Sequence, residues 1–211
     1  MRRALLLALA ATVVAAPLSA QSACAAKGPR LPSAGGWAEY RTARGDMRLA
    51  YLARETAGER LEIAATSQRG SMVMQMVVPG FPYEMGEIKE MVMQAEGQPA
   101  MRMPETMMGM MRGRMPRATQ LSEASCARMI KVGDESITVA AGTFQTTYWR
   151  DSTGGTDVWV SPRVPFGTVK VVSGENSMEL IGSGTGATTR ITGPIGDMPG
   201  MPQGGGRPRG R

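Results

Sequence analysis

The chain of 211 residues has no histidine, only two cysteines and few aromatic residues, which make up 5% of the total. Without histidine, the protein cannot use Ser-His-Asp or Cys-His catalysis, histidine zinc sites or histidine pH switches. With so few aromatic residues, a core must rely on Val, Ile, Leu, Ala and Met. The hydrophobic content of 42% is ordinary for a globular protein, and the length indicates one domain with short appendages.

Enzyme motifs are also lacking. The 18 acidic residues are scattered without a paired-carboxylate motif, and no Ser-x-x-Lys motif occurs. The glycine-rich segment 182–186 does not lead into a helix, so it predicts a hairpin turn rather than a phosphate-binding loop. We therefore expect no catalytic residues, no cofactor and no enzymatic activity.

Residues 1–20 have the three regions of a secretory signal peptide. Two arginines supply the positive start, residues 4–16 form an apolar run with one threonine, and residues 17–20 form the cleavage region. The run of 13 residues is shorter than the ~20 residues that a membrane-spanning helix needs. We predict cleavage after Ala20, with cleavage after Ala25 as the alternative. The mature protein is then periplasmic or secreted and has no transmembrane helix.

The two cysteines follow from this compartment. In an oxidising environment, Cys24 and Cys126 are expected to form a disulfide. A bridge that closes a ~100-residue loop stabilises a fold by up to ~4.7 kcal/mol in the chain-entropy model. Two alternatives stay open. In the first, Cys24 is the lipidated first residue of the mature chain, although Gln21 occupies the position at which a lipobox has an aliphatic residue. In the second, Cys24 is unpaired or is removed by cleavage. The intact mass with and without reductant distinguishes the three.

The two ends of the mature chain differ in composition from its middle. Residues 21–36 are predicted to be an extended lead-in. Residues 193–211 contain seven glycines and four prolines and cannot bury enough apolar surface to offset chain entropy, so we predict a disordered tail. The candidate role of this tail is a weak contact with an anionic membrane surface through Arg207, Arg209 and Arg211. The mature chain has 22 basic and 18 acidic residues, and this small excess does not indicate a nucleic-acid partner.

Residues 37–192 have the pattern of one β domain. Short apolar segments recur roughly every eight to twelve residues between Gly-, Pro- and Asp-rich turns, which is typical of an antiparallel sheet or barrel. Gly133 and Asp134 predict one such turn, and residues 95–98 another. The predicted strands cover residues 47–54, 60–65, 71–78, 86–94, 99–103, 128–132, 136–140, 143–150, 157–161, 168–172, 177–181 and 188–191.

Two segments are predicted to be helical, which makes the fold class mainly β with an α+β character. The spacing of Met107, Met111 and Met115 at i, i+4 and i+8 predicts a short helix over residues 104–115, begun by a proline. A second short helix is predicted over residues 119–124. The expected architecture is a curved antiparallel sheet, or open half-barrel, with one or two short covering helices.

Methionine is the compositional anomaly, because 13 of the 19 methionines lie within the 44 residues 72–115. Three interpretations compete. Methionine fills irregular gaps in cores, and the alternation of Met72, Met74 and Met76 fits one inward strand face. A flexible, apolar methionine surface also suits an adaptable binding groove. Thioethers, finally, are soft ligands that select Cu(I).

The main hypothesis is an exported, non-enzymatic protein that holds a hydrophobic ligand in a methionine-lined groove. The ligand is an acyl chain, a lipid or a lipoprotein segment. The first alternative is a periplasmic Cu(I)-binding protein, in which Met107, Met108 and Met111 converge on a helix. The second alternative is a structural or envelope-interaction protein. The predicted ligand-binding residues are Met72, Met74, Met76, Met91, Met93, Met107, Met108 and Met111.

Several strand and turn segments resemble periplasmic domains of the lipoprotein-localisation-factor (LolA-like) type and their methionine-rich relatives. This resemblance implies a strongly curved half-barrel whose apolar concave face is partly closed by helices and loops. It also implies binding of acyl chains or lipoproteins, and it supplies no catalytic residues. The segments that carry it are 36–40, 101–108, 139–144, 148–149, 158–162, 164–170 and 178–182.

Overall fold

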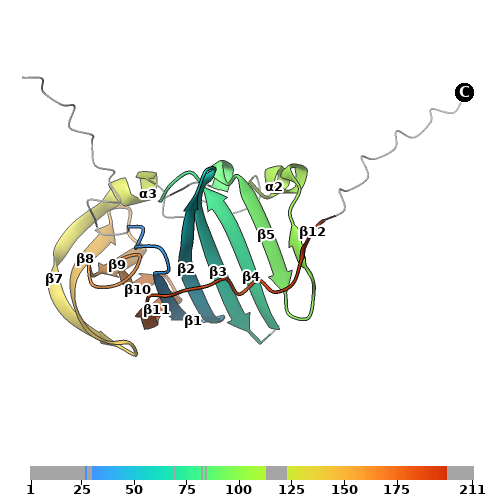
Figure 1. Ribbon diagram of the computed structural model, residues 1–211. Helices are drawn as coiled ribbons and strands as arrows, with labels where there is room; N and C mark the ends of the chain where they lie inside the picture. The colour runs from blue at the N-terminus through green and yellow to red at the C-terminus, as the bar shows by residue number, and fades with distance from the viewer. Residues whose placement is uncertain are drawn as a thin grey trace, which may run out of the picture.

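The protein folds mainly as β structure, which confirms the predicted fold class (Figure 1). This computed structural model describes Lys27 and residues 30–68, 70–81, 83, 85–112 and 123–198. The strands are β1 (Trp37–Thr42), β2 (Gly45–Glu55), β3 (Gly58–Ser67), β4 (Gly70–Val78), β5 (Glu90–Ala95), β6 (Ala100–Arg102), β7 (Met129–Val139), β8 (Gly142–Asp151), β9 (Thr156–Val160), β10 (Thr168–Ser173), β11 (Asn176–Gly184) and β12 (Ile195–Asp197). The helical elements are the 3-10 turn η1 (Met85–Glu87) and the α-helices α2 (Glu105–Arg112) and α3 (Glu123–Arg128).

All twelve strands belong to one curved sheet in the order β12-β6-β5-β4-β3-β2-β1-β11-β10-β9-β8-β7. Strands β1 to β6 form one antiparallel meander, and β7 to β11 form a second. The two meanders join where β1 pairs with β11. The β7–β8 hairpin bends strongly in Figure 1, and its tip returns to the centre of the sheet, where Ala141 N donates to Leu180 O at 3.3 Å.

Strand β7 differs from its prediction. The Gly133–Asp134 pair was expected to separate two strands, but β7 runs through it without a turn. Instead, the register of β7 on β8 shifts between Lys131 and Gly133, so one extra residue is absorbed as a bulge. The expectation of a turn was wrong. Glycine is found in β-bulges as well as in turns, and a bulge lets the strand continue.

The C-terminal part of the chain differs more strongly from its prediction. Residues 188–191 are not a strand. They belong to a segment, residues 185–194, that we call the strap, which crosses in front of β2 to β5 in Figure 1. The chain then forms β12, which pairs in parallel with β6. The predicted disorder of residues 193–211 is therefore wrong for residues 193–198, where Met198 N donates to Arg102 O at 3.0 Å. Residues 199–211 lie outside the described residues.

The helices are close to the predicted positions. Helix α2 begins one residue after the predicted start, and α3 begins four residues later than predicted. Residues 113–122, which include the predicted end of the first helix, lie outside the described residues. Among the described residues, no helix has both the length and the apolar character to span a membrane.

The two faces of β3, β4 and β5 carry different side chains. Because neighbouring residues on a strand alternate in direction, the register Leu61–Met76–Met91 defines one face, which we call the inner face. The opposite, outer face carries Glu62 and Gln75. The hydrophobic core lies on the inner face and consists of Ala38, Tyr40, Tyr51, Leu61, Met76, Val78, Ile88, Met91, Met103, Met108, Val139, Val164, Phe166, Val169 and Leu180.

Candidate functional site

Methionines on the inner face of β4, β5 and β6 form three rows that run across the strands. In the first row, Met72 pairs with Ala95. The middle row consists of Met74, Met93 and Met101, each directly opposite the next. The third row consists of Met76, Met91 and Met103, where Met103 N donates to Met91 O at 2.8 Å. Residues directly opposite one another have Cβ atoms about 4.5–5.5 Å apart, so the methionines of one row are neighbours on the sheet.

The exposure of the rows falls steadily along the strands. Met72 in the first row is 40% exposed. The side chains of the middle row are half-buried. In the third row, Met76 is 1% and Met91 is 2% exposed. The inner face is therefore a packed core at one end and an open apolar surface at the other.

Aromatic residues close the packed end. Phe81 lies between Tyr83, at a centroid distance of 6.4 Å, and Phe166, at 5.8 Å with an edge-on ring. Burial raises the pKa of the Tyr83 hydroxyl to about 12. The backbone of Phe166 has a φ of 63°, a left-handed conformation that is unusual for a large side chain, and its ring is buried in the core. Packing of the ring therefore maintains this turn.

Helix α2 lies against the same core. Met108 is 6% exposed and belongs to the core, and Met107 is half-buried against it. Met110 points away and is 47% exposed. The side chain of Met111 lies outside the described residues. The expectation that this helix packs on the methionine-bearing face is confirmed for Met107 and Met108.

The inner face also holds one buried carboxylate at the packed end. Glu59, two residues from Leu61 on β3, is 3% exposed. The hydroxyl of Tyr51 donates to Glu59 Oε2 at 2.6 Å, and the guanidinium of Arg54 binds Oε1. Burial by itself would raise the pKa of Glu59, but these two hydrogen bonds and the charge of Arg54 overcome it and lower the pKa. Both carboxylate oxygens of Glu59 thus have partners within the fold.

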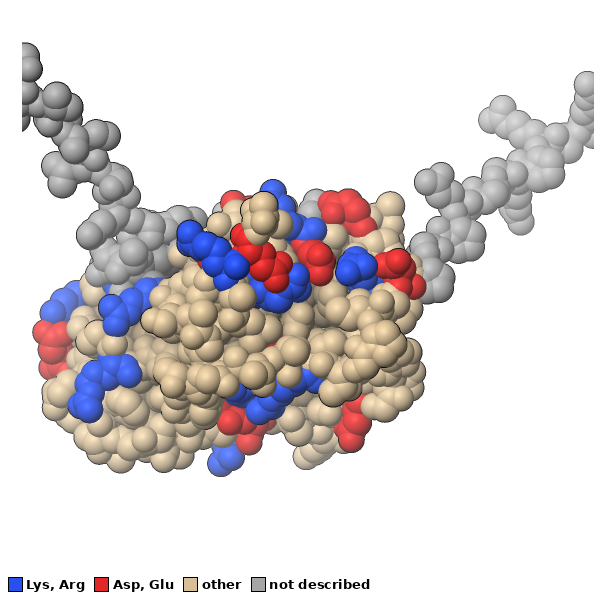
Figure 2. Space-filling model, viewed as in Figure 1, with Lys and Arg blue, Asp and Glu red and all other residues tan. Residues whose placement is uncertain are grey.

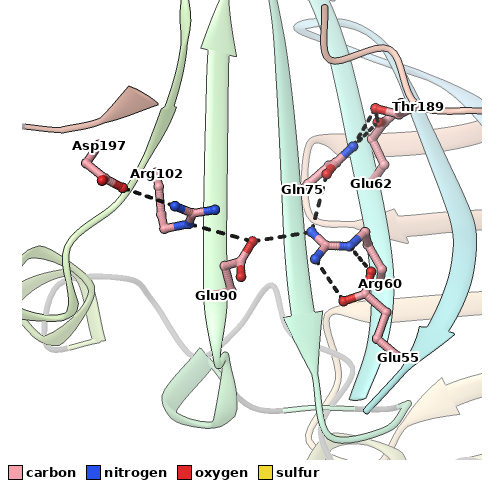
Figure 3. Close-up of polar contacts among 8 residues, drawn as sticks. All are labelled: Glu55, Arg60, Glu62, Gln75, Glu90, Arg102, Thr189 and Asp197. Atoms are coloured by element: carbon pink, nitrogen blue, oxygen red, sulfur yellow. Dashed lines mark hydrogen bonds and ion pairs between the residues drawn. The ribbon is translucent and has the colours of Figure 1, made fainter. Parts of the chain in front are cut away.

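The outer face carries a chain of ion pairs across neighbouring strands (Figure 3). Arg60 Nη2 binds Glu55 at 2.8 Å, and Arg60 Nη1 reaches Glu90 at 3.5 Å. Arg102 approaches Glu90 at 3.9 Å and binds Asp197 at 3.1 Å. The chain links β2, β3, β5, β6 and β12. In Figure 2, acidic and basic side chains are interspersed along the upper margin of this face, and the middle band is uncharged.

Glu62 anchors the strap to the outer face. Its side chain is 1% exposed and accepts hydrogen bonds from Gln75 Nε2 at 3.0 Å and Thr189 Oγ1 at 2.9 Å (Figure 3). The backbone N of Arg190 also donates to both Glu62 oxygens, at 3.0 and 3.1 Å. Further along, Thr192 N donates to Gln94 Oε1 at 2.9 Å. Polar side chains on the outer face thus replace the strand partners that the strap lacks.

A hollow of about 340 Å³ lies on the outer side, between the strap and the β5–β6 turn. Its walls include Arg190 and Glu96, and Glu96 is held by hydrogen bonds from the backbone and hydroxyl of Ser71 at 3.0 and 3.2 Å. This hollow is lined by polar side chains as well as by Val73 and Ala95, and it lies on the opposite face from the methionine rows. It is therefore not the apolar groove that the sequence predicts.

The structure brings most of the predicted ligand-binding residues to one surface. Met72, Met74, Met76, Met91 and Met93 share the inner face of β4 and β5. The prediction omitted Met101 on β6 and Met103 directly after β6, which extend the middle and third rows. Their alternation directly after the predicted turn at residues 95–98 was the available signal. That turn is confirmed, with Gln98 N donating to Ala95 O at 3.0 Å.

The predicted disulfide concerns the other meander. Cys126 on α3 is 3% exposed, and Cys24 lies outside the described residues. Lys27, three residues after Cys24 in the chain, donates to Ala127 O at 3.2 Å and to Met129 O at 2.6 Å. Lys27 therefore lies beside the C-terminal end of α3, and the Cys24–Cys126 pairing stays a prediction.

Conventional metal ligands do not cluster in the parts of the chain that the structure describes: no group of three His, Cys, Asp or Glu side chains is placed to hold an ion. The arrangement thus offers an apolar, sulfur-rich surface on the inner face and ion-paired polar groups on the outer face.

No protein-family model and no curated protein sequence matches the chain. Among solved structures, a candidate lipoprotein from Parabacteroides distasonis is 12% identical, with a TM-score of 0.34, over 75% of this chain and 99% of that one. A candidate exported protein with a YmcC-like fold from Bacteroides fragilis is 10% identical, with a TM-score of 0.33, over 75% of this chain and 100% of that one. Similarity at this level does not indicate function, and the resemblance to the LolA-like group stays a prediction.

Proposed function

We propose that the protein is an exported binding protein that holds an acyl chain on the open part of the inner face. The observation that supports this proposal is the graded exposure of the three methionine rows. Met72 is 40% exposed beside the half-buried middle row, whereas the third row is buried. A sheet face that served packing alone would gain stability from burying the exposed row as well.

The chemistry of the surface selects the class of ligand. The methionine rows offer only thioethers and methylene groups, and the neighbouring positions on β3 are Ile63 and Ala65. Thioether sulfur is a weak hydrogen-bond acceptor and donates no hydrogen bond. A polar ligand would lose its hydration there without replacement, whereas a flexible hydrocarbon chain gains contact with side chains that adapt to it. The acyl chain belongs to a free lipid or to a lipid-modified segment of another envelope protein.

Export is the other half of the proposal, and it rests on the N-terminal sequence. Residues 1–20 have the order of a basic start, a short apolar run and a small-residue cleavage site. An exported carrier of acyl chains needs no cofactor or catalytic group, which agrees with the absence of catalytic motifs in the sequence.

Uptake of a fluorescent fatty acid by the purified mature protein tests the proposal, together with native mass spectrometry after gentle purification. The variant Met74→Lys places a charge in the middle row, and burial of that charge against an acyl chain is unfavourable. We expect it to weaken binding at least about tenfold, or about 1.4 kcal/mol. The control is Met110→Lys, which puts the same charge on the exposed side of α2 and should bind as the wild type does.

Two results would contradict the proposal. One is wild-type protein that is consistently ligand-free and takes up no fatty acid. The other is equal weakening by Met74→Lys and Met110→Lys, which would indicate a charge effect unrelated to the inner face. The circular dichroism spectrum and melting temperature of each variant verify that the sheet is intact.

A further inference from the structure

The middle row places three methionines from three neighbouring strands directly opposite one another. Met74 on β4 is directly opposite Met93 on β5, and Met93 is directly opposite Met101 on β6. Successive methionines along one strand lie on the same face but ~6.6 Å apart, from the ~3.3 Å rise per residue, which is wide for shared coordination. Across strands the Cβ atoms are about 4.5–5.5 Å apart. Each methionine has three rotatable side-chain bonds, so the three sulfurs are able to converge on one point.

The middle row is the best placed of the three rows for a ligand that enters from solvent. The first row contributes a single thioether, because Met72 lies opposite Ala95. The third row is closed, since Met76 and Met91 are 1% and 2% exposed and their sulfurs pack in the core. The side chains of the middle row are half-buried, and are thus shielded from bulk water yet still reachable.

The thioether of Met101 lies over its β12 neighbour Gly196, on the side of β6 away from Met93, so its sulfur joins Met93 and Met74 by rotation of the side chain. Gly196 pairs with Met101, and a Cβ at this position would lie 3.3 Å from Met101 Sδ, closer than side-chain atoms ordinarily approach. Any larger residue at 196 would therefore press on the thioether. The strap crosses the sheet and leads into β12, and it therefore places Gly196 beside Met101.

From this arrangement we propose that Met74, Met93 and Met101 form a Cu(I) site with three thioether ligands. Thioethers are soft, neutral donors that select Cu(I) over the harder divalent ions. A monovalent ion bound by neutral ligands adds one charge to the site, which is the smallest charge a metal ion can bring to an apolar surface. The methionine pair of α2 is less suitable, because Met108 is buried in the core and Met107 packs against it. The proposal goes beyond acyl-chain binding and does not depend on it.

Titration of the full mature protein with Cu(I) under anaerobic conditions, against a competing chelator, tests the site, and Ag(I) serves as a redox-inert probe. We expect one ion per chain by native mass spectrometry. The triple variant Met74→Leu/Met93→Leu/Met101→Leu keeps the apolar volume but removes the sulfurs. It should lower the affinity by more than about tenfold, because even groups behind the metal ligands cost ~10–100-fold.

The control is Met47→Leu/Met110→Leu/Met178→Leu, which removes the same number of thioethers elsewhere and should retain the wild-type affinity. Equal affinity of the triad variant and the wild type would overturn the proposal, as would an equal loss in the control. Fatty-acid uptake by the wild-type protein in metal-free solution is measured separately, because it does not require copper. Absence of copper binding with normal fatty-acid uptake would overturn this site alone, and absence of fatty-acid uptake with normal copper binding would overturn the proposed function alone.

Discussion

The two faces of β3, β4 and β5 are covered from water in different ways. The outer face holds Glu62 and Gln75, and it is covered by a polar strap that lacks regular strand pairing and bonds to these side chains. The inner face holds methionines, and within the described part of the chain packing covers it at one end. The difference teaches that specific polar contacts define where the strap lies, whereas none of the described segments makes comparable contacts with the open end of the methionine face.

The largest effect should come from the packed end of the inner face. Met76→Ala removes a side chain that is 1% exposed, and we expect a loss of about 2–5 kcal/mol in the free energy of unfolding. Met72→Ala, two residues along the same strand face, should cost less than ~0.5 kcal/mol, because its side chain is already 40% exposed. Denaturant unfolding measures both. Equal losses would mean that the difference in side-chain exposure along the inner face does not affect the free energy of unfolding.

An intermediate effect is expected at the strap anchor. Glu62→Ala leaves the Gln75 amide and the Arg190 N–H without their acceptor in a buried place, and each unmade hydrogen bond of this kind costs about 1–3 kcal/mol. Glu62→Gln keeps one acceptor oxygen and should cost less than Glu62→Ala. Hydrogen exchange of residues 187–192 should accelerate in both variants. The exposed Glu175→Ala is the matched control, and if it destabilised the protein as strongly, Glu62 would not be a specific anchor.

The smallest effect concerns the buried carboxylate of the inner face. Because hydrogen bonds from Tyr51 and Arg54 lower the pKa of Glu59 in the folded state, the ionised form contributes stability that is present above the unfolded pKa. That contribution is lost as the pH falls below about 4.3 towards the folded pKa. We expect Glu59→Gln to flatten the decline of unfolding free energy over this range, whereas Glu175→Gln should not. Parallel pH profiles for wild type and Glu59→Gln would show that the carboxylate adds nothing.

Much of the sheet was predictable from local patterns. Alternation predicted the strands β2 and β3, because residues with a period of two on a half-buried strand are visible in the sequence, and a run that is apolar on nearly both faces predicted β4. The position of α2 was predictable from the i, i+4 spacing of methionines. The continuity of β7 was not, because a glycine in a strand reads equally as a turn or as a bulge. The parallel edge strand β12 was missed, because its three residues stand in a glycine- and proline-rich segment whose local propensity opposes a strand.

The sequence alone determined the class of the fold, the alternation that puts Met72, Met74 and Met76 on one strand face, and the absence of histidine chemistry. These are local properties that follow from residue type and spacing. Only the tertiary structure decided which methionines become core and which stay accessible, because burial depends on which loops and helices pack over each row. It likewise decided that Met101 joins Met74 and Met93, because strand register brings together residues that are distant in the chain.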